Sequence, residues 1–233
     1  MRVPDAIQDK ARAGLELMLA HPAHHFDWKI RRDIYQLFAP YSDPPIFRAR
    51  CHLAISAAEY VLPIFTSHFP DQDLPSRLIA TAVGIVVGQI DRNDPHVSEV
   101  EDEGYHANGG YMAYDATTQM VLYNASYAAF AAYKALAEIR HMQNPWQHVD
   151  RLSKSNNLYA AAGRVNPSLS TPGSQFTDED WASLAAAGDT AAAAAMAFST
   201  SERDPAPKAD RLKEFWGWWV NVALPGAWQA VDA

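Results

Sequence analysis

The chain has 233 residues, of which 48% are hydrophobic and 20% are charged, with a formal net charge of −8 and a single cysteine. A length below about 250 residues favours one domain, here residues 1–233, and one cysteine excludes a disulfide within the chain. The acidic balance argues against binding of nucleic acid, because phosphate-binding surfaces need clustered lysine and arginine. It favours a partner with a basic surface.

Two features bear on the cellular location. The first ten residues, MRVPDAIQDK, lack the apolar core of a secretory signal. No stretch reaches the roughly 18 apolar residues that would predict a membrane span. We therefore expect a cytoplasmic protein that does not bind a membrane.

The first part of the chain is predicted to be helical. Alanine is abundant, and valine, isoleucine and threonine do not gather in alternating runs. Three helices are expected at residues 6–20, 27–38 and 44–65. Asp27 is the expected N-cap of the second helix. Pro63 is expected to kink the third helix or to end it early.

The middle of the chain is less regular. A fourth helix is predicted at 78–90, where Gly84 and Gly88, one turn apart, leave a smooth face that another helix could approach. The next segment, 91–110, has the pattern of an acidic helix that stops at its glycine pair. A long helix rich in alanine and aromatic residues is then expected from about residue 111 or 116 to His141.

The last third of the chain contains the clearest loop. Residues 145–162 are compatible with another helix, and 163–176 are predicted to be an exposed loop because they contain two prolines and two glycines. Short and long helices are expected around 189–195 and 207–223, and Pro225 is expected to redirect the chain. The predicted architecture is all-α, a single-domain bundle of about eight or nine helices.

A doubled Glu-x-x-His motif is the sharpest metal signal. It occurs twice, and each copy puts a carboxylate and an imidazole one helical turn apart. Di-iron bundles use two such pairs with two more glutamates. Chance and helix-end electrostatics also explain the pattern, so no cofactor is the first expectation and iron or another divalent metal is the alternative. The alternative ligands are Glu59, Glu103, His106, Glu138 and His141, with Glu16 as a further partner.

Nucleophilic catalysis has little support. The chain contains no Gly-x-Ser-x-Gly, Gly-x-x-x-x-Gly-Lys or Gly-x-Gly-x-x-Gly motif. Cys51 falls on the apolar face of its helix, which favours a core residue over a dyad with His52. The cluster of His21, His24 and His25 flanks a helix end, which explains it better than metal binding. No catalytic residue is predicted.

Two features point to a partner instead. Six acids lie between residues 91 and 103 with only Arg92 opposing them, so this segment is either a solvated face or a contact for the basic active site of a partner. Four tryptophans lie close together near the C-terminus, and core packing is favoured for them over an interface. Trp218 points away from the face that Trp216 and Trp219 share. The candidate partner-binding residues are Asp91, Asp94, Glu99, Glu101, Asp102, Glu103 and Trp218.

A resemblance supports the partner interpretation. The stretch Ala57-Ala58-Glu59-Tyr60-Val61-Leu62-Pro63-Ile64-Phe65, followed by Phe69-Pro70-Asp71 and Pro75-Ser76-Arg77-Leu78-Ile79-Ala80, resembles bacterial immunity proteins of the all-helical, immunity protein five-like type, which are found beside polymorphic toxins. The alanine-rich helix at 116–139 looks like the family's later region, so about half of the chain is covered. The matched residues are helix and turn residues.

The resemblance implies a cytoplasmic protein that neutralises a cognate bacterial toxin by occlusion, and it transfers no catalytic residue. Two other functions stay open at this point. One is a helical-bundle metalloenzyme with a di-iron site, and the other is a non-enzymatic helical scaffold. The amino-acid sequence does not indicate an oligomeric state.

Overall fold

The computed structural model describes residues 1–233 except 39, 41–42, 119–122, 142–184, 196–208 and 233. Every regular element in the described part is helical, which confirms the all-α prediction. No helix there is long and apolar enough to cross a membrane. The elements are α1 (Asp5–Ala20), α2 (Trp28–Leu37), α3 (Pro44–His68), α4 (Leu74–Val86), α5 (Pro95–Thr118), α6 (Tyr123–His141), α9 (Ala187–Ala195), α10 (Ala209–Trp218), the π-turn η3 (Trp219–Ala223), α11 (Leu224–Gln229) and the 3-10 turn η4 (Ala230–Asp232).

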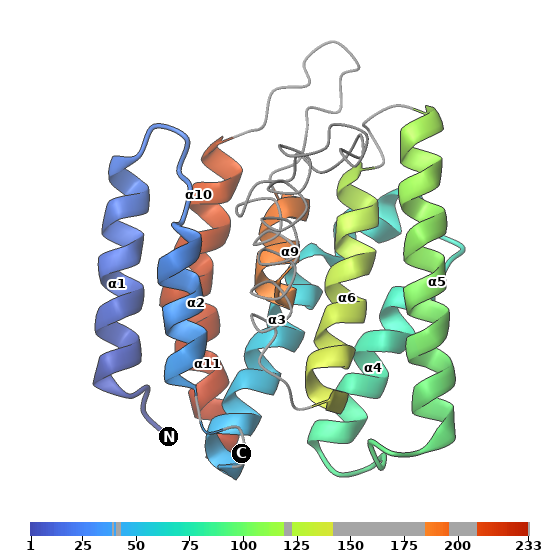
Figure 1. The fold of residues 1–233 in the computed structure, drawn as a ribbon, viewed down its shortest axis with the longest axis horizontal. Coiled ribbons are helices and arrows are strands. Elements are labelled where there is room, and N and C mark those ends of the chain that lie inside the picture. The colour runs from blue at the N-terminus through green and yellow to red at the C-terminus, as the bar shows by residue number, and fades with distance from the viewer. Residues whose placement is uncertain (39, 41–42, 119–122, 142–184, 196–208, 233) are drawn as a thin grey trace, which may run out of the picture.

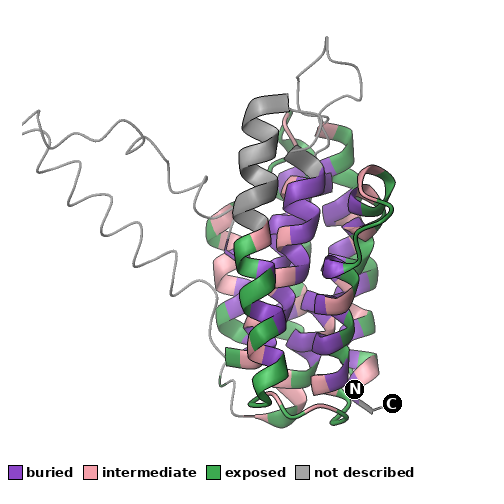
Figure 2. Ribbon diagram, turned by 90° about the vertical axis from the view of Figure 1, so that its right-hand side faces the viewer, coloured by how far each residue is buried: buried purple, intermediate pink, exposed green. Residues whose placement is uncertain are grey.

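The helices form a bundle with α3, α6 and α9 at its centre (Figure 1). The α1–α2 pair and the C-terminal helices α10 and α11 lie on one side of this centre. The α4–α5 pair lies on the other side. Buried residues face inward along the length of the bundle, and exposed residues face outward (Figure 2). This is the amphipathic pattern that drives helices to pack.

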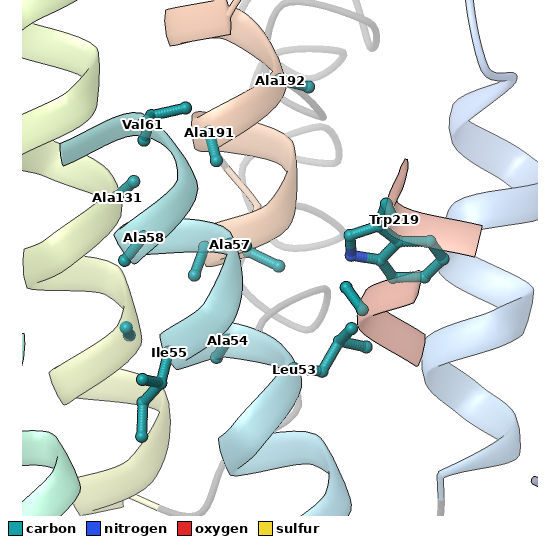
Figure 3. Packing of buried hydrophobic residues seen from close by; sticks show 14 of the residues in the cluster. Leu53, Ala54, Ile55, Ala57, Ala58, Val61, Ala131, Ala191, Ala192 and Trp219 are labelled. Atoms are coloured by element: carbon teal, nitrogen blue, oxygen red, sulfur yellow. The ribbon is translucent and has the colours of Figure 1, made fainter. Parts of the chain in front are cut away.

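Alanine side chains fill the contact between α3, α6 and α9 (Figure 3). Ala57 and Ala58 of α3, Ala131 of α6 and Ala191 of α9 are completely buried. Because alanine projects only one methyl group, the helix backbones can approach closely. The large ring of Trp219 closes the core from the side of the C-terminal helices (Figure 3). The alanine-rich composition therefore sets the tight spacing at the centre of the bundle.

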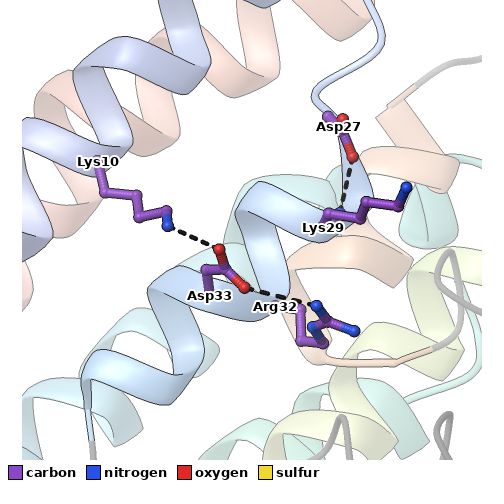
Figure 4. Close-up of polar contacts among 5 residues, drawn as sticks. All are labelled: Lys10, Asp27, Lys29, Arg32 and Asp33. Atoms are coloured by element: carbon purple, nitrogen blue, oxygen red, sulfur yellow. Dashed lines mark hydrogen bonds and ion pairs between the residues drawn. The ribbon is translucent and has the colours of Figure 1, made fainter.

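Polar contacts connect α1 to α2 and start the second helix (Figure 4). The side chain of Asp27 accepts a hydrogen bond from the backbone N–H of Lys29 at 2.8 Å, which confirms its predicted role as the N-cap. Lys10 of α1 donates to Asp33 of α2 at 2.6 Å. A Cβ at Gly14 would lie only 2.6 Å from the ring of Phe26, so the glycine lets the chain entering α2 lie directly on α1.

Helix α3 continues past Pro63 to His68, so the expected early end is wrong. Proline lacks the N–H that would bond to the carbonyl of Glu59 four residues earlier. Both residues are exposed, and water can bond to that carbonyl in place of the missing donor. Burial of Val61 and Phe65 on either side of the proline holds the helix together.

Gly84 in the last turn of α4 and Gly88 just after the helix form a helix end and not a helix-packing face, which corrects the expectation. The helix ends at Val86, and Gly88 follows with a φ of +74°. The N–H of Gln89 donates to the carbonyl of Gly84 at 2.8 Å, and that of Gly88 donates to Ile85 at 3.1 Å. This is a Schellman motif. Ile90 folds back over Gly84 and occupies the space that a second helix would need.

Helix α5 runs through the Asn108-Gly109-Gly110 segment to Thr118, so the expected glycine stop is wrong. A single long helix was expected from about residue 111 or 116 to His141, and this is also wrong. The first part of that range belongs to the end of α5, and the rest forms the separate helix α6. Each glycine costs a helix only about 1 kcal/mol. Packing of α5 along α6 outweighs that cost.

The C-terminal helices also continue where a change of direction was expected. The π-turn η3 joins α10 to α11, and the N–H of Leu224 donates to the carbonyl of Trp219 five residues earlier. Pro225 lies in the first turn of α11, where a missing N–H costs little. The short helix predicted around 189–195 is confirmed as α9. The predictions for 145–162 and 163–176 fall outside the described residues.

Candidate functional site

The acidic segment singled out in the sequence begins in the turn before α5. The Asp91 carboxylate accepts a hydrogen bond from the N–H of Asn93 at 2.9 Å, and that of Asp94 accepts one from the N–H of His96 at 2.9 Å. Asp94 thereby caps the start of α5, where a negative charge meets the positive end of the helix dipole. Both acids have a local structural role and still face solvent.

Three more acids share one outer face of α5. Glu99, Asp102 and Glu103 are exposed, and their spacing places them together on the helix surface. Glu103 pairs with Arg77 of α4 at 2.7 Å, and Arg77 also contacts Asp73 at 3.2 Å. The hydrogen bond to Glu103 is the main cause of the raised pKa of Arg77. We call the exposed set the α5 acidic face: Asp91, Asp94, Glu99, Asp102 and Glu103.

Glu101 differs from its neighbours because it faces inward. Its side chain is 8% exposed, and it pairs with Arg140 and with His141 Nε2, the latter at 2.8 Å. Both partners come from the last turn of α6. Burial, followed by the charge of Glu101, raises the pKa of Tyr133 to about 12. Glu101 therefore ties α5 to α6 and is poorly placed to reach a partner.

The tryptophans near the C-terminus divide into core and surface residues. Trp216, Trp219 and Trp228 are at most 2% exposed, as the core interpretation predicts. Trp218 is half-buried and packs on Tyr60 of α3 with ring centroids 4.2 Å apart. Trp218 lies on the α10 side of the bundle, across the central helices from α5 (Figure 1). The predicted partner-binding residues therefore fall on two separate surfaces.

The residues of the metal alternative are dispersed. Glu59 is exposed on α3, and Glu103 and His106 are exposed on α5. Glu138 points to the start of α9, whereas His141 points to α5. No group of three or more His, Cys, Asp or Glu side chains suited to a metal forms within the described ranges. The two Glu-x-x-His motifs therefore do not meet each other as a di-iron site requires.

Cys51 is a core residue, and the cluster of His21, His24 and His25 makes local contacts in the α1–α2 turn. Cys51 is 1% exposed, and burial raises the pKa of its thiol to about 12, so the thiol stays neutral and unreactive. The prediction that Cys51 is a core residue is confirmed. His24 has a φ of +50° in the α1–α2 turn, with its ring Nδ1 3.3 Å from the carbonyl of Met18. The rings of His21 and His25 meet edge to face with centroids 6.0 Å apart.

The centre of the bundle contains charged side chains that the sequence argument did not single out as a group. Arg31 of α2 pairs with Asp189 of α9 at 3.0 Å, and both side chains are at most 7% exposed. The second carboxylate oxygen of Asp189 accepts from the N–H of Ala186 at 3.1 Å. This pair fixes α9 against α2 inside the molecule.

Glu138 of α6 makes the second half of this arrangement. One carboxylate oxygen accepts from the N–H of Ala187, the first residue of α9, at 2.6 Å. Arg50 of α3 donates to the backbone carbonyl of Glu138 at 3.2 Å. Burial raises the pKa of Glu138, and burial lowers the pKa of Lys134 one turn earlier. We call the four buried charged residues the buried charge cluster: Arg31, Arg50, Glu138 and Asp189, with the half-buried Lys134 as their neighbour on α6.

The sequence holds weak signals for this cluster. Arg50 lies next to Cys51, on a helix that becomes apolar from Leu53 onward, and Asp189 lies between two alanine runs, Ala185–Ala187 and Ala191–Ala195. A charged residue in such a setting is rarely buried unless it is paired. The partners could not be assigned, because they come from four helices far apart in the chain. Glu138 was noticed only as a possible ligand, since its spacing to His141 matched a metal motif.

Comparisons with known proteins add no assignment. No protein-family model matches the chain, and no sequence among the curated proteins matches it at a significant level.

Proposed function

We propose that this protein is an immunity-type binding protein that neutralises a cognate bacterial toxin by covering the toxin's basic active site. The α5 acidic face is the contact surface in this proposal. The observation that carries it is the gathering of five exposed carboxylates on the α5 helix and the turn before it. The sequence resemblance to immunity proteins points in the same direction.

The composition of the acidic face supports a role in recognition. Arg92 and Arg77 are its basic neighbours, and Arg77 is already paired with Glu103 and Asp73. Tyr105, which is 61% exposed, adds a large aromatic ring beside the acids. Aromatic residues are enriched among the side chains that dominate binding energy at interfaces.

Electrostatics explains why such a face would suit a toxin. Enzymes that act on nucleic acids or nucleotides hold phosphates with lysine and arginine, and a surface of carboxylates can occupy the same positions. Complementary charge raises the association rate and selects the partner. Because α5 packs on α4 and α6, the carboxylates are presented on a rigid helix, and little ordering entropy is lost on binding.

The test is co-expression with the product of the neighbouring open reading frame. We expect the protein to bind that product and to rescue growth, and the double variant E99K/D102K to lose both effects. The matched control is D9K/E16K, which reverses two exposed acids on α1 and leaves the α5 acidic face intact. Absence of binding to any neighbour-encoded protein, or equal loss in both variants, would contradict the proposal.

A further inference from the structure

A groove of about 510 Å³ lies between α1 and α10, away from the α5 acidic face. Its apolar wall consists of Leu15 and Leu19 of α1 together with Trp218 of α10. Leu19 is 45% exposed and Tyr60, which packs on Trp218, is 40% exposed, so apolar surface remains in contact with solvent here. We call this feature the α1–α10 groove.

Gly217 opens the floor of the groove. Apart from Gly217, its two chain neighbours and the adjacent backbone of α10, no atom of the described residues lies within 4 Å of the position that a Cβ at Gly217 would take. A glycine inside a helix is unfavourable relative to alanine, and no packing contact in the described structure requires one at this position. Bare backbone at a groove is typical of a place where a ligand approaches closely. Gly217 therefore leaves open space at the floor of the groove among the residues that the structure describes.

Two carboxylates line the same groove. Asp210 and Glu214 are one helical turn apart on α10, which brings two like charges onto one face. Neither forms an ion pair with any residue that the structure describes, and the cation that lines the groove with them is Lys213. The negative charge of Glu214 also contributes, after burial, to the raised pKa of Tyr60. A cation entering the groove would relieve the repulsion between the two acids.

We propose that the α1–α10 groove is a docking site for an arginine or lysine side chain of a partner protein. The aliphatic stem of that side chain packs against Leu15, Leu19 and Trp218. Its charged head lies between Asp210 and Glu214. This combination of an apolar wall and two acids matches the amphipathic form of a long basic side chain. The site is independent of the α5 acidic face and of the toxin proposal.

The probe is the peptide acetyl-Leu-Arg-Ala-Leu-Arg-amide, titrated into the full chain labelled at the tryptophan indole nitrogens. The variant W218F identifies the indole resonance of Trp218. We expect a saturable shift of that resonance, and binding at least about tenfold weaker for the same peptide with uncharged citrulline in place of arginine. No saturable shift up to about 10 mM peptide, or equal binding of both peptides, would overturn the proposal.

Two glycine variants separate binding from stability. G217A should raise the unfolding temperature, because alanine favours the helix, and should weaken peptide binding because its methyl group enters the groove. G226A is the control, since Gly226 of α11 also has open space around it and does not line the groove. It should raise the unfolding temperature and leave binding unchanged. Equal peptide affinity of the two variants would contradict the proposal.

Two sets of charge variants should change peptide binding in opposite directions. D210N/E214Q removes both carboxylates and should abolish the preference for arginine over citrulline. K213A removes the resident cation and should strengthen binding about threefold. If K213A weakens binding as D210N/E214Q does, the groove is not selecting a cation and the proposal fails.

Discussion

Glu138 is a carboxylate enclosed by alanine-rich helices, and its environment penalises the charged form. Burial raises its pKa above the ordinary value of 4.5, against the opposing effects of Arg50, the Ala187 N–H and Lys134. The unfolded chain therefore releases this proton at lower pH than the folded chain does. Between these two pKa values the folded state binds more protons, so the contribution of Glu138 to stability falls as pH rises through this window.

The first prediction follows from that sign. In E138Q the titrating group is absent, so the fall in stability that Glu138 causes in the pH range above about 4.5 should be missing from its free energy of unfolding. The unsubstituted protein should gain stability relative to E138Q as the pH is lowered through this range. Urea unfolding followed by circular dichroism at several pH values measures the difference. E99Q, at an exposed site on α5, should reproduce the unsubstituted pH dependence, and an E138Q curve parallel to it would contradict the argument.

Gly14 leads to a prediction in which packing overrides helix propensity. Alanine is the better helix former, but a Cβ at Gly14 would lie 2.6 Å from Phe26 and 2.8 Å from Ile30. We expect G14A to lower the free energy of unfolding by about 2 kcal/mol through overpacking. Thermal unfolding checks this against G226A, where a methyl group meets open space and should stabilise the protein. A stabilised G14A would show that the α1–α2 contact is loose.

Residue spacing alone could not separate the surface acids from the buried one. The density of acids between residues 91 and 103 indicated a solvated face or a partner contact, and Glu99, Asp102 and Glu103 are exposed. It grouped Glu101 with them because charge density was the only criterion. The burial of Glu101 depends on Arg140 and His141, which are about 40 positions away in the chain and reach it only when α6 packs on α5.

At the level of elements, amphipathic spacing predicted where most helices lie, and local breakers were the main source of error. Pro63, the Gly109-Gly110 pair and Pro225 were each expected to end a helix or change its direction, and the helices continue through all three. A glycine or proline inside a helix lowers helix stability by about 1–3 kcal/mol relative to alanine. Packing against neighbouring helices outweighs that amount, and single-sequence reasoning does not contain those neighbours. The π-turn η3 likewise had no local signal.

The two ion-pair links of α5 provide a prediction about how elements are held together. Glu101 is enclosed between α5 and α6, whereas Glu103 bridges to Arg77 on the surface. Removing a buried partner leaves Arg140 without its acceptor, so E101A should cost about 3 kcal/mol of stability. E103A should cost less than about 1 kcal/mol, because solvent screens the exposed pair. Chemical unfolding measures the loss in free energy of unfolding for each variant. Equal losses would mean that Glu101 is better solvated than its burial indicates.

On the scale of the whole molecule, the candidate contact residues divide into two surfaces with the central helices between them (Figure 1). The α5 acidic face carries exposed carboxylates on a helix surface. The α1–α10 groove has an apolar wall and two carboxylates. Substitutions in sites that share no partner usually act additively. Charge changes on α5 should therefore leave peptide binding in the groove unchanged. The sequence grouped Trp218 with the acids of α5, because the distance between α10 and α5 depends on how the helices pack.

The net charge of −8 also acts over the whole molecule, and its distribution would set the association rate of the proposed basic partner. If the α5 acidic face steers that encounter, the association rate constant should fall at least about tenfold from low to physiological salt, while the dissociation rate changes little. E99K/D102K should lower the rate at low salt and flatten this dependence. D9K/E16K changes the net charge equally, from −8 to −4, but on α1, so it should keep most of the dependence. Stopped-flow measurements with the proposed toxin partner would distinguish the two cases. Equal flattening in both variants would assign the effect to net charge and not to the α5 acidic face.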